Sequence, residues 1–255
     1  MFHTIFYQPI LNLVVFLYNI VPGHDLGVAI IVLTIIIKMV LWPLSRKSIK
    51  AQKALQDLQP KIEEIKKKYA DNKEEMGKAM MELYKNHKIN PLSSCLPLLV
   101  QLPFLWAVFR VFRDGFNNGS LDLVYSFVYK PEVINSVSFG ILDLSKPNIL
   151  LAILAGGAQF WQAKMMSTKK PKVDSKGAQD EGMAAMMNKQ MLYMMPAITV
   201  FIGLTLPGGL TLYWFVTTVL TALQQIIVFK KKEDDDQKDN DKNSNNKIVE
   251  GELVK

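Results

Sequence analysis

The sequence predicts an all-α polytopic membrane protein with five core transmembrane helices. The chain has 255 residues, of which 49% are hydrophobic and only 21% are charged, and its apolar runs are too long for the core of a soluble domain. A helix needs about 20 mostly apolar residues to cross a bilayer. Five runs approach that length, and they cover residues 26–44, 91–111, 148–166, 190–206 and 210–229. Residues 26–229 are therefore the expected membrane core.

Residues 1–25 precede this core and are expected to form an N-terminal interfacial helix. The segment is apolar, but Gln8, Asn12 and Asn19 would fall on one side of a helix and Pro9 interrupts it. These features are typical of a helix that lies at the membrane surface, although a sixth span is an alternative. Because the segment has no basic start and no small-residue cleavage site, it is not interpreted as a signal peptide.

Residues 45–90 predict a helical hairpin between the first two spans. Apolar residues recur every three or four positions in each half of the segment, with Lys and Glu between them. They are Leu55, Leu58, Ile62, Ile65 and Tyr69 in the first half, and Met76, Met80 and Leu83 in the second. Asp71 followed by Glu74 has the pattern of a capping box, which places the turn near residues 70–72.

The later spans carry several features that affect their shape. Asn90 and Pro91 form a typical start for the second span, while Pro97 and Pro103 inside it each remove a backbone hydrogen bond and predict a bent helix. The sequence Pro207-Gly208-Gly209 predicts a tight turn between the last two spans.

Residues 230–255 are charged and low in complexity, so we expect a disordered tail.

The distribution of Lys and Arg predicts the orientation of the chain. Residues 1–37 contain neither residue type, whereas residues 45–90 contain twelve, residues 167–189 five and residues 230–255 seven. Cytoplasmic loops of membrane proteins are rich in these residues. The N-terminus is therefore expected outside and the C-terminus in the cytoplasm. Most of the net charge of +7 would then face anionic lipid, ribosomal RNA or acidic protein segments.

Lys38 is the most informative single residue, because it lies within an apolar run that is otherwise free of charge. A lysine at the centre of a membrane helix costs roughly 2.5–3.5 kcal/mol, so such residues usually face a polar cavity or a partner. Snorkelling to the cytoplasmic surface is the alternative. However, side chains lean toward the N-terminus of their helix, which in this orientation points Lys38 away from that surface.

The sequence contains no recognisable enzyme motif. Cys95 is the only cysteine, His3, His24 and His87 are scattered, and neither a phosphate-binding Gly-Lys-Ser/Thr loop nor a GxSxG elbow is present. We therefore expect a protein that is not an enzyme and that has no cofactor and no metal site.

Three segments together resemble the YidC-type membrane protein insertases, which are related to the mitochondrial Oxa and chloroplast Albino insertases. They are DLGVAIIVLTIIIKMVLWPLSRKSIKAQKALQDLQPKIEEIKKKY, ELYKNHKINPLSSCLPLLVQLPFLWAVFRVF and MMPAITVFIGLTLPGGLTLYWFVTTVLTALQQ. The resemblance covers roughly residues 13–229. It implies five core spans with a cytoplasmic hairpin between the first two, in the plasma membrane of a bacterium. We therefore expect a minimal form of the family, without the large extracytoplasmic domain of Gram-negative members.

The resemblance also implies a site and partners. In the family, a positive residue, usually arginine, lies five residues before a Pro-Leu pair and projects into a hydrophilic groove; here that position is Lys38. Thr34, Trp214 and Gln159 or Gln162 match groove positions by the same resemblance. The implied function is to move short polar flanks of client proteins through the groove, release their apolar segments into lipid and assist their folding. Implied partners are nascent membrane proteins, the ribosome, anionic lipids, the Sec translocon and the signal recognition machinery.

The alternative function is a small-solute transporter or channel that uses Lys38 as an anion site. Transporters are commonly built from internal repeats, and the five runs show none. The hairpin at residues 45–90 would also have no role in such a protein. An intramembrane enzyme is a weaker alternative, because the sequence shows no recognisable pair of nucleophile and base.

Overall fold

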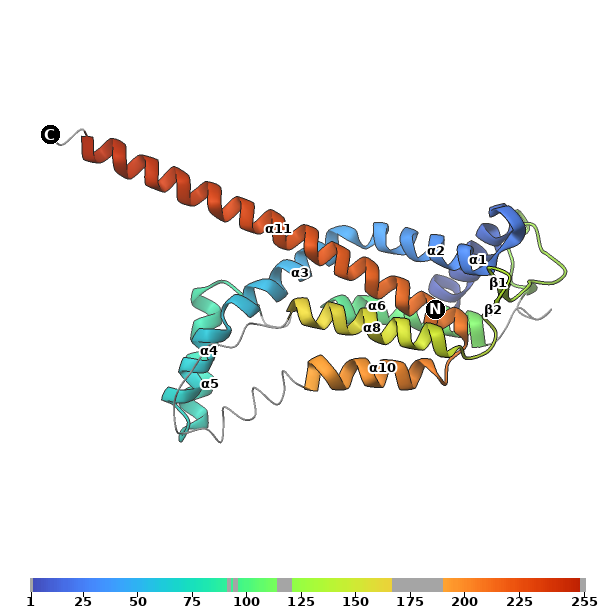
Figure 1. Cartoon of the computed structure of the whole chain (residues 1–255), viewed down its shortest axis with the longest axis horizontal. Helices are drawn as coiled ribbons and strands as arrows, with labels where there is room; N and C mark the ends of the chain where they lie inside the picture. The colour runs from blue at the N-terminus through green and yellow to red at the C-terminus, as the bar shows by residue number, and fades with distance from the viewer. Residues whose placement is uncertain (1, 91–92, 94–95, 114–120, 167–189, 253–255) are drawn as a thin grey trace.

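The protein is mostly helical, and its helices run along one another in an elongated bundle (Figure 1). The computed structural model describes residues 2–90, 93, 96–113, 121–166 and 190–252. The elements in chain order are η1 (His3–Tyr7), α1 (Gln8–Ile20), η2 (Pro22–His24), α2 (Leu26–Val40), α3 (Trp42–Asp57), α4 (Gln59–Lys68), α5 (Lys73–Asn86), α6 (Leu96–Arg113), β1 (Val137–Ser138), β2 (Leu142–Asp143), α8 (Ile149–Met166), η4 (Gln190–Met194), α10 (Met195–Gly203) and α11 (Gly208–Glu252).

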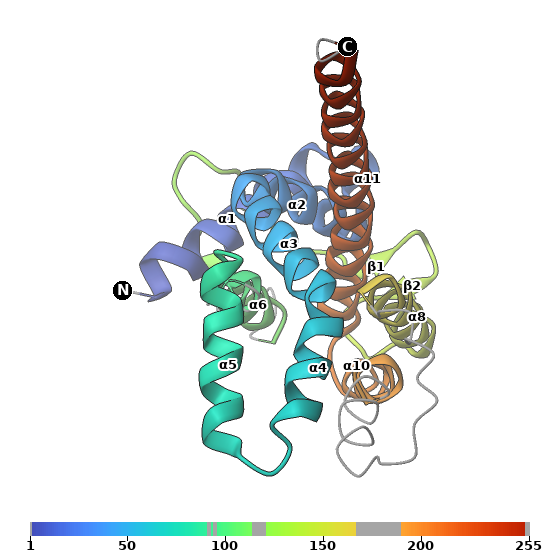
Figure 2. The ribbon, with the colours of Figure 1, turned by 90° about the vertical axis from the view of Figure 1, so that its left-hand side faces the viewer.

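Helix α11 is central to the packing, since it contacts α8, α2, α3 and α6, while α10 lies against α8. The paired helices α4 and α5 extend from one end of the bundle, and the antiparallel strands β1 and β2 lie at the opposite end (Figures 1 and 2). Among the described residues, Ile149–Met166 and Gly208–Lys230 are each long and apolar enough to cross a membrane, and the bent pair α2–α3 makes a third candidate. The structure therefore agrees with an all-α membrane protein.

The first apolar helix ends earlier than the sequence predicts. The expected span covered residues 26–44, but α2 stops at Val40 and the chain bends by 71° into α3. Pro43 lies in the first turn of α3, where its missing N–H has no helical acceptor in any case. Pro43 therefore helps to start the basic helix α3. The expected start of the second span at Pro91 lies outside the described residues, as do Cys95 and the basic loop 167–189.

The polar side chains of the N-terminal helix bind the backbone of a distant loop. Asn12 accepts a hydrogen bond from the N–H of Tyr125 at 2.6 Å and donates to the carbonyl of Leu123 at 3.2 Å. Gln8 donates to the same carbonyl at 3.1 Å, and Asn19 donates to the carbonyl of Tyr129 at 2.7 Å. The apolar side of α1, including Leu11, Val14 and Val15, is fully buried. The polar stripe that suggested contact with the membrane surface thus holds a loop in place.

The turn between α4 and α5 falls where it was expected, but its capping residue is different. Asn72, rather than Asp71, precedes α5, and its side chain accepts hydrogen bonds from the N–H groups of Glu74 and Glu75 at 3.2 Å each. Asp71 is one residue too early to serve as the cap. Near the other end of the pair, the ammonium of Lys61 on α4 lies 3.0 Å from Nε2 of His87, which follows α5.

The C-terminal segment differs from the disordered tail that we expected at residues 230–255. Helix α11 continues from its apolar part to Glu252 (Figure 1). Low hydrophobicity means that this segment cannot form a core, but extending an existing helix requires no new nucleus. Residues 230–250 contain neither Pro nor Gly, although ten of the 21 are Asp, Asn or Ser, which are weaker helix formers than Lys, Glu and Gln.

Asp25 links the N-terminus of α2 to the β1–β2 strand pair. Its carboxylate accepts hydrogen bonds from the backbone of Gly27 at 2.8 Å, Val28 at 3.1 Å and Phe139 at 2.6 Å, and also from the hydroxyl of Ser138. Burial raises the pKa of Asp25. The hydrogen bonds from Ser138 and from the three backbone N–H groups together lower it by more, so the pKa lies below its ordinary value. Gly27 is required here, because a Cβ would collide with the side chain of Ser138.

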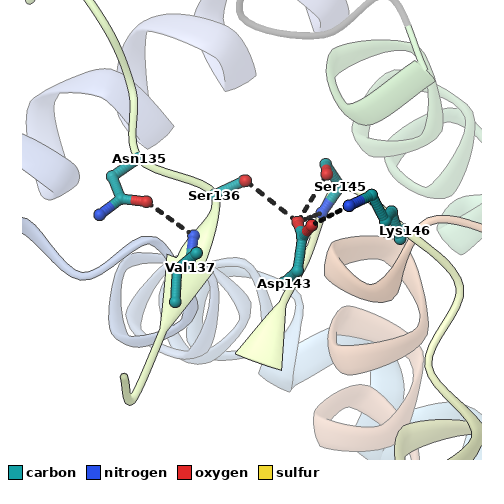
Figure 3. A network of polar contacts seen from close by, with 6 residues as sticks. All are labelled: Asn135, Ser136, Val137, Asp143, Ser145 and Lys146. Carbon is teal, nitrogen blue, oxygen red and sulfur yellow. Dashed lines mark hydrogen bonds and ion pairs between the residues drawn. The ribbon is translucent and has the colours of Figure 1, made fainter. Parts of the chain in front are cut away.

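Asp143 organises the other side of this strand pair (Figure 3). Its carboxylate accepts from Ser145 through both the hydroxyl at 2.5 Å and the backbone N–H at 3.0 Å, it lies 3.1 Å from the ammonium of Lys146, and it accepts from Ser136 at 3.1 Å. The hydrogen bonds from Ser145 and Lys146 hold the pKa of Asp143 well below its ordinary range. The expected Pro207-Gly208-Gly209 turn docks beside it, as Gly208 donates to the carbonyl of Lys146 at 2.9 Å.

Candidate functional site

Lys38 on α2 contacts α11 in the middle of the bundle. Its ammonium donates a hydrogen bond to the hydroxyl of Thr221 at 2.7 Å. Thr221 is 13 residues after Gly208 and nine before Lys230 in the membrane-length part of α11, or roughly 20 Å and 14 Å from its two ends at 1.5 Å per residue. Lys38 is in the last turn of α2, and its ammonium reaches across to a residue well inside the membrane-length part of the partner helix.

A line of polar groups extends from Lys38 along α11. Tyr213, Thr217 and Thr221 are four residues apart, so they share one face of the helix. At the far end of this line, the side-chain amide of Gln101 on α6 donates to the hydroxyl of Tyr213 at 2.5 Å. Together with Lys38 and Gln101, these three residues form what we call the polar seam. It joins α2, α6 and α11.

The two ends of the seam differ in their exposure. Tyr213 is only 1% exposed and lies in the main hydrophobic cluster with Leu121 and Leu144 from the loops at the β1–β2 end. Lys38, by contrast, is half-buried, and the next residue, Met39, is 68% exposed. The seam is thus closed toward the strand pair, while its Lys38 end is only partly covered.

The charge of Lys38 is only partly compensated. Within the part of the chain that the structure describes, its ammonium has the hydroxyl of Thr221 as its hydrogen-bond partner and no carboxylate within ion-pair distance. A lysine ammonium has three donors, and a buried charge is costly unless it is paired. The hydroxyl of Thr217, one turn from Thr221, is also buried, and its polar neighbour is the hydroxyl of Tyr213. An incoming carboxylate or other anion would satisfy these groups.

Comparison with known proteins identifies the family. The model of a family described as "60Kd inner membrane protein" matches residues 16–236. This chain belongs to that family. Curated relatives carry the name Membrane protein insertase YidC, and two of them illustrate the match. The protein from Geobacter sp. (strain M21) is 36% identical over 220 residues, which are 86% of this chain and 35% of the relative. The protein from Fusobacterium nucleatum subsp. nucleatum is 34% identical over 221 residues, which are 86% of this chain and 94% of the relative.

Family membership places the chain in a bacterial membrane, in agreement with its apolar helices. The match also bears out the resemblance to YidC-type insertases that the sequence motifs suggested. The chain spans about a third of the length of several YidC relatives, including the Geobacter protein, but nearly all of the Fusobacterium protein.

The other expected site residues lie within the described part of the chain, but they do not contact Lys38 through hydrogen bonds. Thr34 is 1% exposed, and its hydroxyl donates to the carbonyl of Ile30 at 2.7 Å within its own helix. Trp214 is half-buried beside Tyr213 on α11. Gln159 and Gln162 are half-buried on α8, which packs against α11. Among the described residues, no hydrogen bond joins these four side chains to Lys38.

Sequence reasoning had not assigned Gln101, Tyr213, Thr217 and Thr221 to the site. The four-residue spacing of Tyr213, Thr217 and Thr221 was a usable signal, because it puts three hydroxyls on one face of an apolar helix. Gln101 stands alone between Pro97 and Pro103 in its run, and an isolated polar residue in a membrane helix is also informative. What was missing was the helix pairing that brings α2 and α6 to the same face of α11.

Proposed function

We propose that this chain is a membrane protein insertase that moves short polar flanks of client proteins across part of the bilayer and releases their apolar segments into lipid. The observation that carries the proposal is the partly compensated cation of Lys38, which reaches Thr221 inside the membrane-length part of α11. The printed names of the relatives support it, since they are called membrane protein insertases. Help with the folding of the inserted clients belongs to the same proposal.

The driving force follows from simple electrostatics. A client carboxylate 4 Å from the Lys38 ammonium gains about 4 kcal/mol at an effective dielectric constant near 20, before losses from desolvation. This attraction offsets part of the cost of bringing a polar flank into the bundle. Burial of the client's apolar segment in lipid, at about 20 residues per span, then drives the step to completion. Neither stage requires a nucleotide, a cofactor or a metal ion.

The proposed path combines the seam with the remaining expected residues. Lys38 attracts the flank, the hydroxyls of Thr217 and Thr221 solvate it, and the Tyr213–Gln101 pair closes the far end. Gln159, Gln162 and Trp214 belong to the path as half-buried polar and aromatic groups on α8 and α11. Thr34 lies one turn before Lys38 on α2, so it belongs to the same part of the proposed path. Its hydroxyl already donates to the carbonyl of Ile30 in its own helix.

The proposed topology has five spans, formed by α2, α6, α8, α10 with η4, and α11. In this arrangement the N-terminus and the β1–β2 pair are outside, and α3, the α4–α5 pair and the C-terminus are cytoplasmic. This follows the distribution of Lys and Arg, which are concentrated in residues 45–90, 167–189 and 230–255. The α4–α5 hairpin, together with the basic helix α3, is then the surface that receives nascent chains, the ribosome and the targeting machinery, next to the Sec translocon and anionic lipid.

Reconstitution in liposomes distinguishes insertion from solute transport. The full chain is incorporated into liposomes, and a single-span client with a short acidic flank is synthesised in their presence. We expect protease to spare the flank in these liposomes and to digest it in empty ones. Efflux of a trapped fluorescent anion is measured in the same preparation. Anion efflux without protection of the flank would overturn the proposal in favour of a transporter or channel.

A further inference from the structure

We propose that a pocket between α3 and α11 binds the phosphate-bearing headgroup of an anionic phospholipid. The pocket has a volume of about 190 Å³ and is lined by Trp42, Arg46 and Lys50 on α3 and by Ile227 and Val228 on α11. It lies beyond the α2–α3 bend and is separate from the polar seam. The proposal relies on the membrane location and on a span formed by α2, and it does not depend on insertase activity.

The polar wall of the pocket consists of two cations with no competing carboxylate. Arg46 and Lys50 are four residues apart, so both point to the same side of α3. Within the described part of the chain, neither forms an ion pair, whereas Lys53 on the same helix lies 3.2 Å from Asp57. A guanidinium can bind phosphate through two parallel hydrogen bonds, and an adjacent ammonium adds a second positive charge. This pair is suited to a phosphate group.

The other wall of the pocket is apolar, and it favours a lipid over a soluble phosphate. Trp42 is 39% exposed and Ile227 is 56% exposed, although both are large apolar side chains beside two cations. A free phosphate or a nucleic acid backbone would leave this wall in contact with water. A phospholipid presents a phosphate next to its glycerol and acyl chains, so it would cover both walls. Tryptophan is also enriched at the level of the headgroups.

The ends of the apolar parts of α2 and α11 both place the pocket at the membrane surface. The apolar helix α2 ends at Val40, and the basic helix α3 leaves it at 71°. The membrane-length part of α11 ends at Lys230, two residues after Val228. Both helices therefore change from apolar to charged sequence beside this pocket, which is where the headgroup layer would meet them. Gln224 of α11 also donates to the carbonyl of Trp42 at 3.4 Å, which holds the two walls together.

Native mass spectrometry of the full chain in detergent tests this assignment. Phosphatidylglycerol is titrated into the protein, and phosphatidylcholine with the same acyl chains serves as the headgroup control. Arg46→Gln and Lys50→Gln are each expected to weaken the binding of the first phosphatidylglycerol about fivefold, and the double variant about 25-fold. The matched control is the double variant Lys47→Gln with Lys73→Gln, which removes the same charge from exposed positions outside the pocket and is expected to bind like the wild type.

Three results would overturn the proposal. The first is an equal loss of phosphatidylglycerol in the pocket variant and the control variant, which would mean that binding follows net charge alone. The second is equal retention of phosphatidylcholine and phosphatidylglycerol by the wild type. The third is displacement of the lipid by glycerol 1-phosphate at a similar concentration, which would show that the pocket recognises a soluble phosphate. Insertion of clients is not measured here, so failure would leave the proposed function untouched.

Discussion

Helix α2 has one charged group at its start, Asp25, and another near its end, Lys38. The two differ in how many hydrogen-bond partners the protein gives them. The carboxylate of Asp25 accepts hydrogen bonds from three backbone N–H groups and from the hydroxyl of Ser138. The ammonium of Lys38 has one neutral hydroxyl as its partner among the described residues. A charge that is fully satisfied stabilises the fold, whereas a charge that is left partly unsatisfied is available to a ligand. On this comparison we propose a structural role for Asp25 and a functional role for Lys38.

The largest effect on stability is expected at Asp25, at the start of α2. Asp25→Ala removes the N-cap of α2 together with its bonds to Ser138 and Phe139, so we expect the free energy of unfolding to fall by about 2–3 kcal/mol. Asp25→Asn keeps one acceptor and should lose about half as much. Thermal unfolding in detergent, followed by circular dichroism, measures both. Asp122→Ala, which removes an exposed ion pair with Lys130, is the control and should have little effect. Equal effects at Asp25 and Asp122 would contradict the comparison.

A smaller effect is expected at the closed end of the seam. Tyr213→Phe removes the acceptor of the Gln101 amide, and leaving a buried donor unpaired costs about 1–2 kcal/mol. The same assay measures this loss. Tyr193→Phe is the control, because Tyr193 is 61% exposed and should tolerate the change. If Tyr213→Phe is as stable as the wild type, Gln101 and Tyr213 do not close the seam as described.

The smallest effect is expected in the dependence of stability on pH. The folded pKa values of Asp25 and Asp143 are both lowered, so these groups stabilise the protein above the ordinary pKa of 3.8, and this contribution is lost as the pH falls through the lowered values. The melting temperature should therefore be constant from pH 6 to about pH 4 and fall below that. Asp25→Asn should show a shallower acid decline, while Asp122→Asn should follow the wild type. Parallel acid curves for all three proteins would contradict the role given to Asp25.

The same comparison shows what sequence reasoning can predict. The apolar runs and the lysine at position 38 were visible in the sequence, because they depend on composition and on local order. The partners of the polar residues were not visible. Lys38 meets Thr221, 183 positions away, and Asn12 meets Tyr125, 113 positions away, and neither pairing follows from a local pattern. Both depend on how the helices pack.

Local boundaries failed for a different reason. Pro43 is compatible with the end of one helix and with the first turn of the next, and Asp71 and Asn72 are both good capping residues. In each case, neighbouring positions satisfy the same local rule, and tertiary contacts select between them. The carbonyl of Trp42, for example, accepts from Gln224 of α11, which ties the start of α3 to a particular place on the bundle.

The central claim is that the unsatisfied charge of Lys38 drives insertion of client flanks, and charge substitution at this position tests it most directly. Protease protection is measured in liposomes for two single-span clients that differ only in their flank, one acidic and one neutral. Lys38→Arg should insert both clients at least as well as the wild type. Lys38→Glu should reduce insertion of the acidic flank by tenfold or more and affect the neutral flank much less, because repulsion replaces attraction at this depth. Equal insertion of the acidic flank by the lysine and glutamate forms would contradict the account.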